Sequence, residues 1–122
     1  MPLPAPFDRL RLPVIASPLF IISVPDLVIA QCKAGIVGSF PALNARPSGV
    51  LDEWLHRITE ELAAHNRDNP DRPAAPYAVN QIVHKSNNRL EKDMEVCAKW
   101  QVPMTITSLG AREDINAAAH AY

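Results

Sequence analysis

The sequence predicts a parallel α/β fold of about four βα units in residues 1–122, as a single domain or a fragment of one. Short apolar runs alternate with longer segments of helical period, which is the pattern of successive βα units. The chain has 122 residues and is 48% hydrophobic, which suffices for one buried core. Two of the apolar runs, in residues 12–20 and 77–90, continue into polar or proline-bearing segments. In parallel folds, ligands bind where strands end in this way.

The first predicted unit begins with a strand at Val14 to Ala16 and continues with a helix that starts near Pro25. Proline suits an early helical position because its missing N–H is not needed there. Gly35 is expected to end this helix, since glycine readily adopts the left-handed conformation that follows a helix. The second strand is predicted at Ile36 to Phe40.

A long helix follows, and Ser48 is placed to cap it. Its apolar positions recur at helical spacing and form one stripe, which consists of Leu51, Trp54, Leu55, Ile58 and Leu62. Residues 66–76 are rich in Asn, Asp and Pro, so we expect a turn-rich connector. The third strand is predicted at Tyr77 to Gln81.

The rest of the third unit and the whole fourth unit are expected between residue 87 and residue 122. Asn87 or Asn88 can cap a third helix, whose inward side carries Leu90, Met94 and Cys97. Residues 102–107 are predicted to form the fourth strand, and Ser108 to Gly110 the turn after it. A final helix is expected from about Ala111 to Tyr122.

Composition narrows the class of protein. Twelve basic and thirteen acidic side chains give a net charge of -1 without a basic cluster, which argues against nucleic-acid binding. Prolines and polar residues interrupt the apolar stretch 12–36, so no membrane span is predicted. Cys32 and Cys97 lie in segments of helical pattern and are interpreted as reduced core thiols of a cytoplasmic protein.

The sequence offers little support for a metal site or a catalytic histidine. His84 lies in a loop without a nearby carboxylate or nucleophile in the sequence, and we interpret it as a hydrogen-bonding residue. The other histidines show no paired metal-ligand spacing, so no metal is predicted. The chain has four glycines and lacks both glycine-rich phosphate-binding fingerprints.

Four sequence strings occur in order at the predicted strand ends: PVIASPLF at 13–20, AGIVGSF at 34–40, VNQIVHKSNNRL at 79–90 and VPMTITSLG at 102–110. Together they resemble the nitronate monooxygenase family, also called 2-nitropropane dioxygenases, and the resemblance runs from about Leu10 to Tyr122. It implies an FMN-dependent oxidoreductase with a (β/α)8 barrel, which oxidises alkyl nitronates with molecular oxygen. This chain would form the N-terminal half of such a barrel.

The resemblance also implies which residues face the flavin. These are Ala16, Ser17, Pro18, Leu19, Phe20, Asn80, Gln81, Ser108 and Gly110. A flavin ring needs an apolar wall and a few groups that hydrogen-bond its heteroatoms, and the Asn80 amide offers both a donor and an acceptor. In the family, the catalytic histidine and the phosphate-binding turns come from later strands, so no catalytic residue is predicted here.

The same residues are compatible with other roles. Ser17 and Pro18 could simply stiffen a loop, and Asn80 could be a buried amide that holds neighbouring strands together. The chain could be a non-catalytic half-barrel that serves in binding or assembly, or a flavoprotein resembling NADH:quinone reductases. Because four βα units do not close a barrel, we expect a homodimer, an open flavodoxin-like sheet or a missing C-terminal half.

Overall fold

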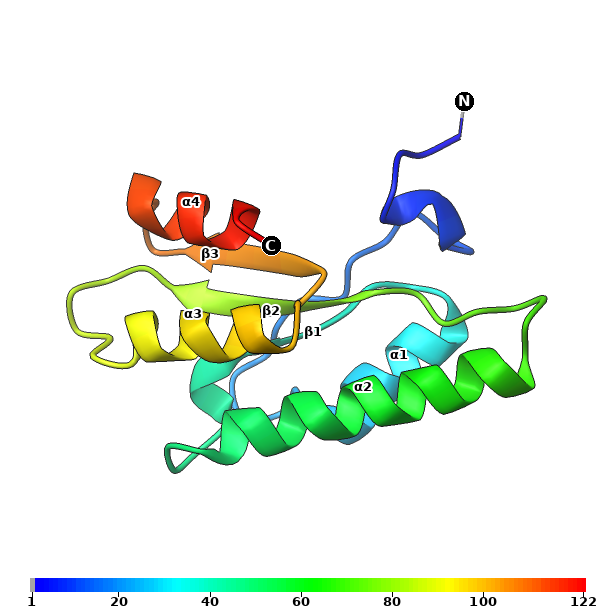
Figure 1. Ribbon diagram of the computed structural model, residues 1–122, viewed down its shortest axis with the longest axis horizontal. Helices are drawn as coiled ribbons and strands as arrows, with labels where there is room; N and C mark the ends of the chain where they lie inside the picture. The colour runs from blue at the N-terminus through cyan, green and yellow to red at the C-terminus, as the bar shows by residue number, and fades with distance from the viewer. Residues whose placement is uncertain (1) are drawn as a thin grey trace.

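Three parallel strands lie side by side in sequence order in the computed structural model, which describes residues 2–122 (Figure 1). They are β1 (Gly38–Pro41), β2 (Tyr77–Ile82) and β3 (Met104–Ser108). The register places Ser39 opposite Ala78 and Asn80 opposite Ile106. The result is a small α/β fold with βα alternation, in which the sheet is open and does not close into a barrel.

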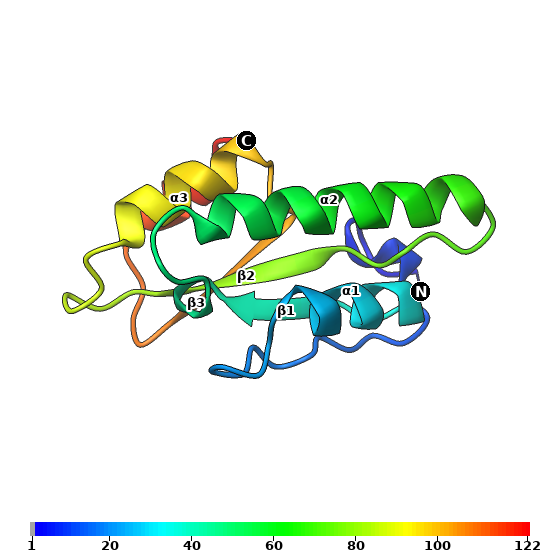
Figure 2. The ribbon, with the colours of Figure 1, turned by 90° about the horizontal axis from the view of Figure 1, so that it is seen from below.

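A helix connects each strand to the next, because neighbouring parallel strands need a long crossover. The α-helices are α1 (Pro25–Ala34), α2 (Val50–Asp68), α3 (Leu90–Lys99) and α4 (Glu113–His120), and two short 3-10 helices are η1 (Phe7–Arg9) and η2 (Ala42–Asn44). Each α-helix packs on the next in sequence, and Figure 2 shows α1 and α2 running alongside the strands. Within residues 2–122, no helix has the length and apolar content needed to cross a membrane.

The prediction of a strand at Val14 to Ala16 is wrong. Only Ile15 pairs there, in a single parallel bridge with Val37. The Val14 N–H donates to the Leu12 carbonyl at 2.7 Å, so it does not bond to a neighbouring strand. Pro13 and Pro18, which flank this segment, have no N–H to donate. Local turn geometry therefore limits pairing to one residue.

Two predicted helix caps are also wrong. The α2 helix begins after Gly49, which has a left-handed φ of 99°, and Ser48 makes no capping hydrogen bond. A backbone bond from Val50 N–H to the Pro47 carbonyl closes that turn instead. The N-cap of α3 is Arg89, and Asn87 accepts the Arg89 N–H as part of the preceding loop. By contrast, Gly35 ends α1 in a left-handed conformation as predicted.

The core lies between the strands and the helices. The apolar stripe of α2 is confirmed, since Leu51, Leu55, Ile58 and Leu62 are buried and Trp54 packs edge-on against Phe40 with ring centroids 5.5 Å apart. Both cysteines are free and buried. Burial raises the pKa of Cys32 to about 11 and that of Cys97 to about 12, so both are protonated thiols that act as apolar packing groups.

Gly38 lets β1 approach α1 closely, and this contact can be tested with Gly38→Ala. A Cβ at this position would lie 2.5 Å from the Val28 carbonyl oxygen and 3.0 Å from the Cys32 sulfur. We expect the variant to lose about 1–3 kcal/mol of unfolding free energy in urea denaturation, because the helix must shift. Gly49→Ala is the control, because its new Cβ would meet nothing within 4 Å. The control should lose only about 1 kcal/mol of unfolding free energy, which is the cost of a left-handed backbone for alanine. If Gly38→Ala unfolded with the same free energy as the wild type, the close packing of β1 on α1 would be contradicted.

Candidate functional site

Asn80 and Ser108 meet at the carboxyl ends of two neighbouring strands. The Asn80 Nδ2 donates to Ser108 Oγ at 3.0 Å and to the Ile106 carbonyl at 2.9 Å. Parallel pairing of β2 with β3 brings these residues to the same edge of the sheet. Asn80 is 6% exposed, so the pair is held in a fixed geometry. The structure therefore brings together two of the residues predicted to face a ligand.

This pair leaves two hydrogen-bonding positions free within the described chain. No donor from residues 2–122 bonds the Asn80 Oδ1, because the contacts of this side chain are all made through Nδ2. Ser108 accepts through Oγ, so its hydroxyl hydrogen stays available as a donor. An acceptor and a donor thus stand next to each other at the strand ends.

The loop that follows the Ile15 bridge reaches the same face of the sheet. The Ser39 hydroxyl donates to the Ala16 carbonyl. Ser39 is opposite Ala78, and side chains two residues apart on a strand share a face, so Ser39 and Asn80 lie on the same side of the sheet. Ala16 is the first residue of the predicted site, and this contact ties it to the face that carries Asn80.

Asn44, which sequence reasoning missed, holds the rest of that loop. Its Nδ2 donates to the carbonyls of Leu19 at 3.0 Å and Ser23 at 2.9 Å, and its Oδ1 accepts the Ile21 N–H at 3.0 Å. Ile21 has a left-handed φ of 67°, which is costly for a β-branched residue. Asn44 therefore imposes a conformation that the loop would not adopt alone. An amide just after the second strand was the only sequence signal for this role.

Residues 19–22, named here the apolar loop, present four large apolar side chains to solvent. Their exposed fractions are 45% for Leu19, 61% for Phe20, 69% for Ile21 and 63% for Ile22. The Arg46 guanidinium lies 5.4 Å from the centre of the Phe20 ring, which is a cation–π contact. Contiguous exposed apolar surface of this kind marks a site for a ligand or a partner.

Gly110 closes the turn after β3. It has a φ of 149°, and a Cβ on it would lie 2.9 Å from the Val83 carbonyl oxygen. The Val83 N–H also donates to the Ser108 carbonyl at 2.8 Å, so the chain segments that leave β2 and β3 run together. Gly110 therefore allows a close backbone approach beside Ser108.

Gln81 is not brought to the Asn80 and Ser108 pair. Side chains alternate along a strand, and the fully buried Gln81 points to α3, where its Nε2 contacts the Cys97 sulfur at 3.4 Å. His84 is also separate from the pair, because it is exposed and bonds Ser86 Oγ at 2.8 Å within its own turn.

A buried carboxyl lies on the inward side of α3. Asp93 is 5% exposed, and its Oδ1 contacts Arg89 Nη2 at 3.2 Å while its Oδ2 has no partner in the described chain. Burial raises the pKa of the Asp93 carboxyl above its ordinary value, and Arg89 offsets only part of this effect. Arg89 also donates to the Ala45 carbonyl at 2.8 Å, so this pair links α3 to the segment after β1.

Loss of the Asn44 amide should free the apolar loop. Asn44→Ala removes three hydrogen bonds, so we expect chymotrypsin to cleave at Phe20 about tenfold or more faster than in the wild type, because local opening becomes easier. The matched control is Asn88→Ala, which removes an exposed amide elsewhere. Equal cleavage rates in Asn44→Ala and the control would show that Asn44 does not hold the loop.

Asp93 should make folding stability depend on pH. Because its folded pKa is raised, its favourable contribution is complete below the unfolded pKa and is lost as pH rises through the folded pKa. Asp93→Asn cannot ionise, so its stability relative to the wild type should increase from about pH 4 to pH 8 in urea denaturation series. The same series on Glu95→Gln, which removes an exposed carboxylate from the same helix, is the matched control. A constant difference for Asp93→Asn would refute the assignment.

Comparisons of the chain with protein-family models, with curated proteins and with solved structures found no match. Function is therefore inferred from the residues of the site itself.

Proposed function

We propose that this chain forms the ring-binding side of an FMN-dependent oxidoreductase that resembles nitronate monooxygenases and oxidises alkyl nitronates with molecular oxygen. The observation that carries the proposal is the free acceptor and donor presented by Asn80 and Ser108 at the strand ends. The loop that starts at Ala16 lies against the same face of the sheet.

The order of the strands supports the N-terminal half of a (β/α)8 barrel as the underlying fold. In doubly wound sheets the strand order reverses at a switch point, whereas in a barrel each strand is followed by its neighbour in sequence. Here Ile15 pairs with Val37, and β1, β2 and β3 follow in order. The successive packing of α1 to α4 agrees with a ring of helices outside such strands.

The free groups suit one edge of a flavin ring. That edge carries an N–H between two carbonyl groups, which would pair with the Asn80 Oδ1 as acceptor and with the Ser108 hydroxyl as donor. The apolar loop would cover the ring and exclude water from it. Bound FMN would supply the electron-accepting group that nitronate oxidation requires, while the residues of this chain hold and orient it.

The chain is proposed to contact the ring and not the phosphate. Its glycines serve other purposes: Gly35 ends α1, Gly38 packs against α1, Gly49 precedes α2 and Gly110 turns beside Val83. The family resemblance assigns both the phosphate-binding turns and the catalytic histidine to later strands. Lumiflavin, which is the ring without the ribityl phosphate, should therefore bind this chain nearly as well as FMN.

Flavin fluorescence quenching tests the proposal directly. We expect the purified chain to quench both FMN and lumiflavin, and Asn80→Ala and Ser108→Ala to weaken binding about tenfold each, which corresponds to one lost hydrogen bond of about 1.4 kcal/mol. Asn88→Ala is the matched amide control, and circular dichroism shows whether each variant is folded.

Failure takes two distinct forms. If the folded chain quenches neither flavin at millimolar concentration, flavin binding by this chain is excluded. If flavin binds but Asn80→Ala and Ser108→Ala bind as tightly as the wild type, the site lies elsewhere.

A second candidate function is a non-catalytic assembly module, which the unpaired outer edge of β3 favours. Large exposed apolar side chains also gather in residues 12–22 and at Leu109, which is 73% exposed. A doubled mass in gel filtration together with no flavin binding would favour this function over the first.

A further inference from the structure

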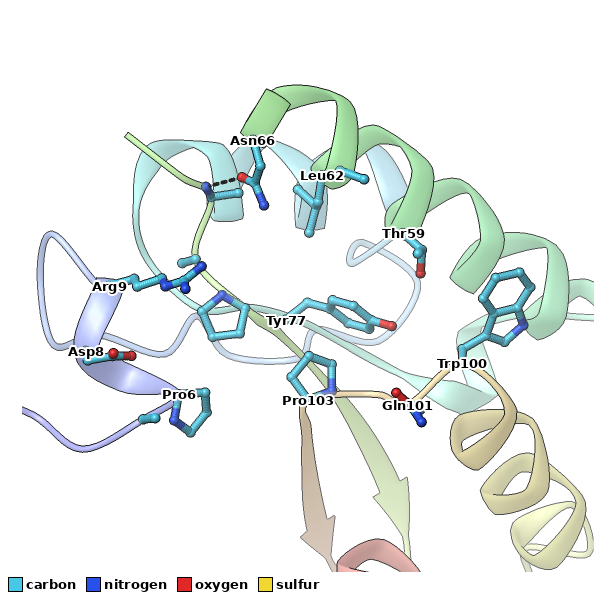
Figure 3. A pocket seen from close by; sticks show the side chains of 15 residues that line it. Pro6, Asp8, Arg9, Thr59, Leu62, Asn66, Tyr77, Trp100, Gln101 and Pro103 are labelled. Carbon is cyan, nitrogen blue, oxygen red and sulfur yellow. Dashed lines mark hydrogen bonds between the residues drawn. The ribbon is translucent and has the colours of Figure 1, made fainter. Parts of the chain in front are cut away.

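A second site lies at the opposite end of the strands from the proposed flavin contacts. A cavity of about 550 Å³ opens between the C-terminal half of α2, the start of β2, the turn before β3 and η1 (Figure 3). Small-molecule sites have volumes of about 300–1,000 Å³. None of the residues that line this cavity is among the predicted flavin contacts.

One wall of the cavity is apolar. Leu62, Pro76 and Pro103 line it, together with Trp100. The Trp100 ring is fixed, because its Nε1 donates to Asp52 at 2.8 Å and the His56 ring stacks on it with centroids 5.3 Å apart. Such a wall suits a flat apolar group.

An unsatisfied hydroxyl lies at the floor of the cavity. Tyr77 is 4% exposed, and its hydroxyl has no hydrogen-bond partner in the described chain. Burial raises the pKa of Tyr77 well above its ordinary value, and the neighbouring Thr59 side chain lowers it by less, so the hydroxyl stays protonated. Buried polar groups are nearly always paired in proteins, so this floor is incompletely satisfied.

The mouth of the cavity carries two opposite charges. Asp8 and Arg9 are neighbours in η1, and Figure 3 shows both side chains extending from η1 toward the cavity. No ion pair within residues 2–122 joins them to each other or to another charged side chain. The mouth thus offers one exposed carboxylate and one exposed guanidinium, which suit a ligand that carries both an ammonium and a carboxylate group.

From these contacts we propose that the cavity binds a free aromatic α-amino acid. The ammonium group of the ligand pairs with Asp8, its carboxylate pairs with Arg9, and its ring enters between the prolines and Trp100. This site is separate from the strand-end site and does not depend on flavin binding.

Calorimetric titration of the full chain with L-phenylalanine tests the inference. We expect binding of L-phenylalanine at least about tenfold tighter than that of phenethylamine, which lacks the carboxylate, or 3-phenylpropionate, which lacks the ammonium. Asp8→Asn should weaken L-phenylalanine binding about tenfold and leave 3-phenylpropionate binding unchanged. Arg9→Gln should also weaken L-phenylalanine binding about tenfold, and it should leave phenethylamine binding unchanged.

The matched controls are Arg67→Gln and Asp68→Asn, because these two residues are also adjacent, exposed and oppositely charged but do not line the cavity. They should bind L-phenylalanine as the wild type does. The inference is overturned if L-phenylalanine shows no binding at millimolar concentration. It is also overturned if L-phenylalanine binds no tighter than its two singly charged analogues, or if the controls lose as much affinity as Asp8→Asn and Arg9→Gln.

Discussion

The parallel pairing of β2 on both of its edges is the constraint on which the rest of the structure depends. The strand is buried between β1 and β3, and its register determines what stands at each end. At the carboxyl end, the register sets Asn80 beside Ser108. At the amino end, it places Tyr77 at the floor of the cavity. A shift of one residue would turn both side chains to the other face, so neither site could survive it.

Strand alternation gives two adjacent amide residues of β2 different surroundings. Asn80 and Gln81 both carry amides, and both are buried. The Asn80 Nδ2 bonds Ser108 and Ile106 at the strand ends, whereas the Gln81 Nε2 contacts the Cys97 sulfur beneath α3. Successive side chains of a strand point to opposite faces of the sheet, so Gln81 faces the helices while Asn80 faces the other side. Gln81 is therefore better placed to position α3 than to touch a ligand.

The apolar loop illustrates how a distant side chain can set local geometry. Its four large side chains are exposed, and Ile21 adopts a backbone conformation that β-branched residues avoid. Hydrogen bonds from Asn44, on the segment after β1, hold that conformation. Such strain persists only where the surroundings impose it, and it is concentrated at ligand and partner sites.

The sequence by itself determined the alternation of strands and helices, the buried stripe of α2 and the end of α1 at Gly35, because periodicity and glycine conformation are local properties. The family resemblance also pointed to Asn80 and Ser108 as residues that would face a flavin. Only the tertiary structure decided that Val14 to Ala16 makes a single bridge, that Gln81 faces α3 and that Asn44 holds the loop. Each of these depends on a partner distant in the chain, and neither propensity nor spacing identifies such a partner.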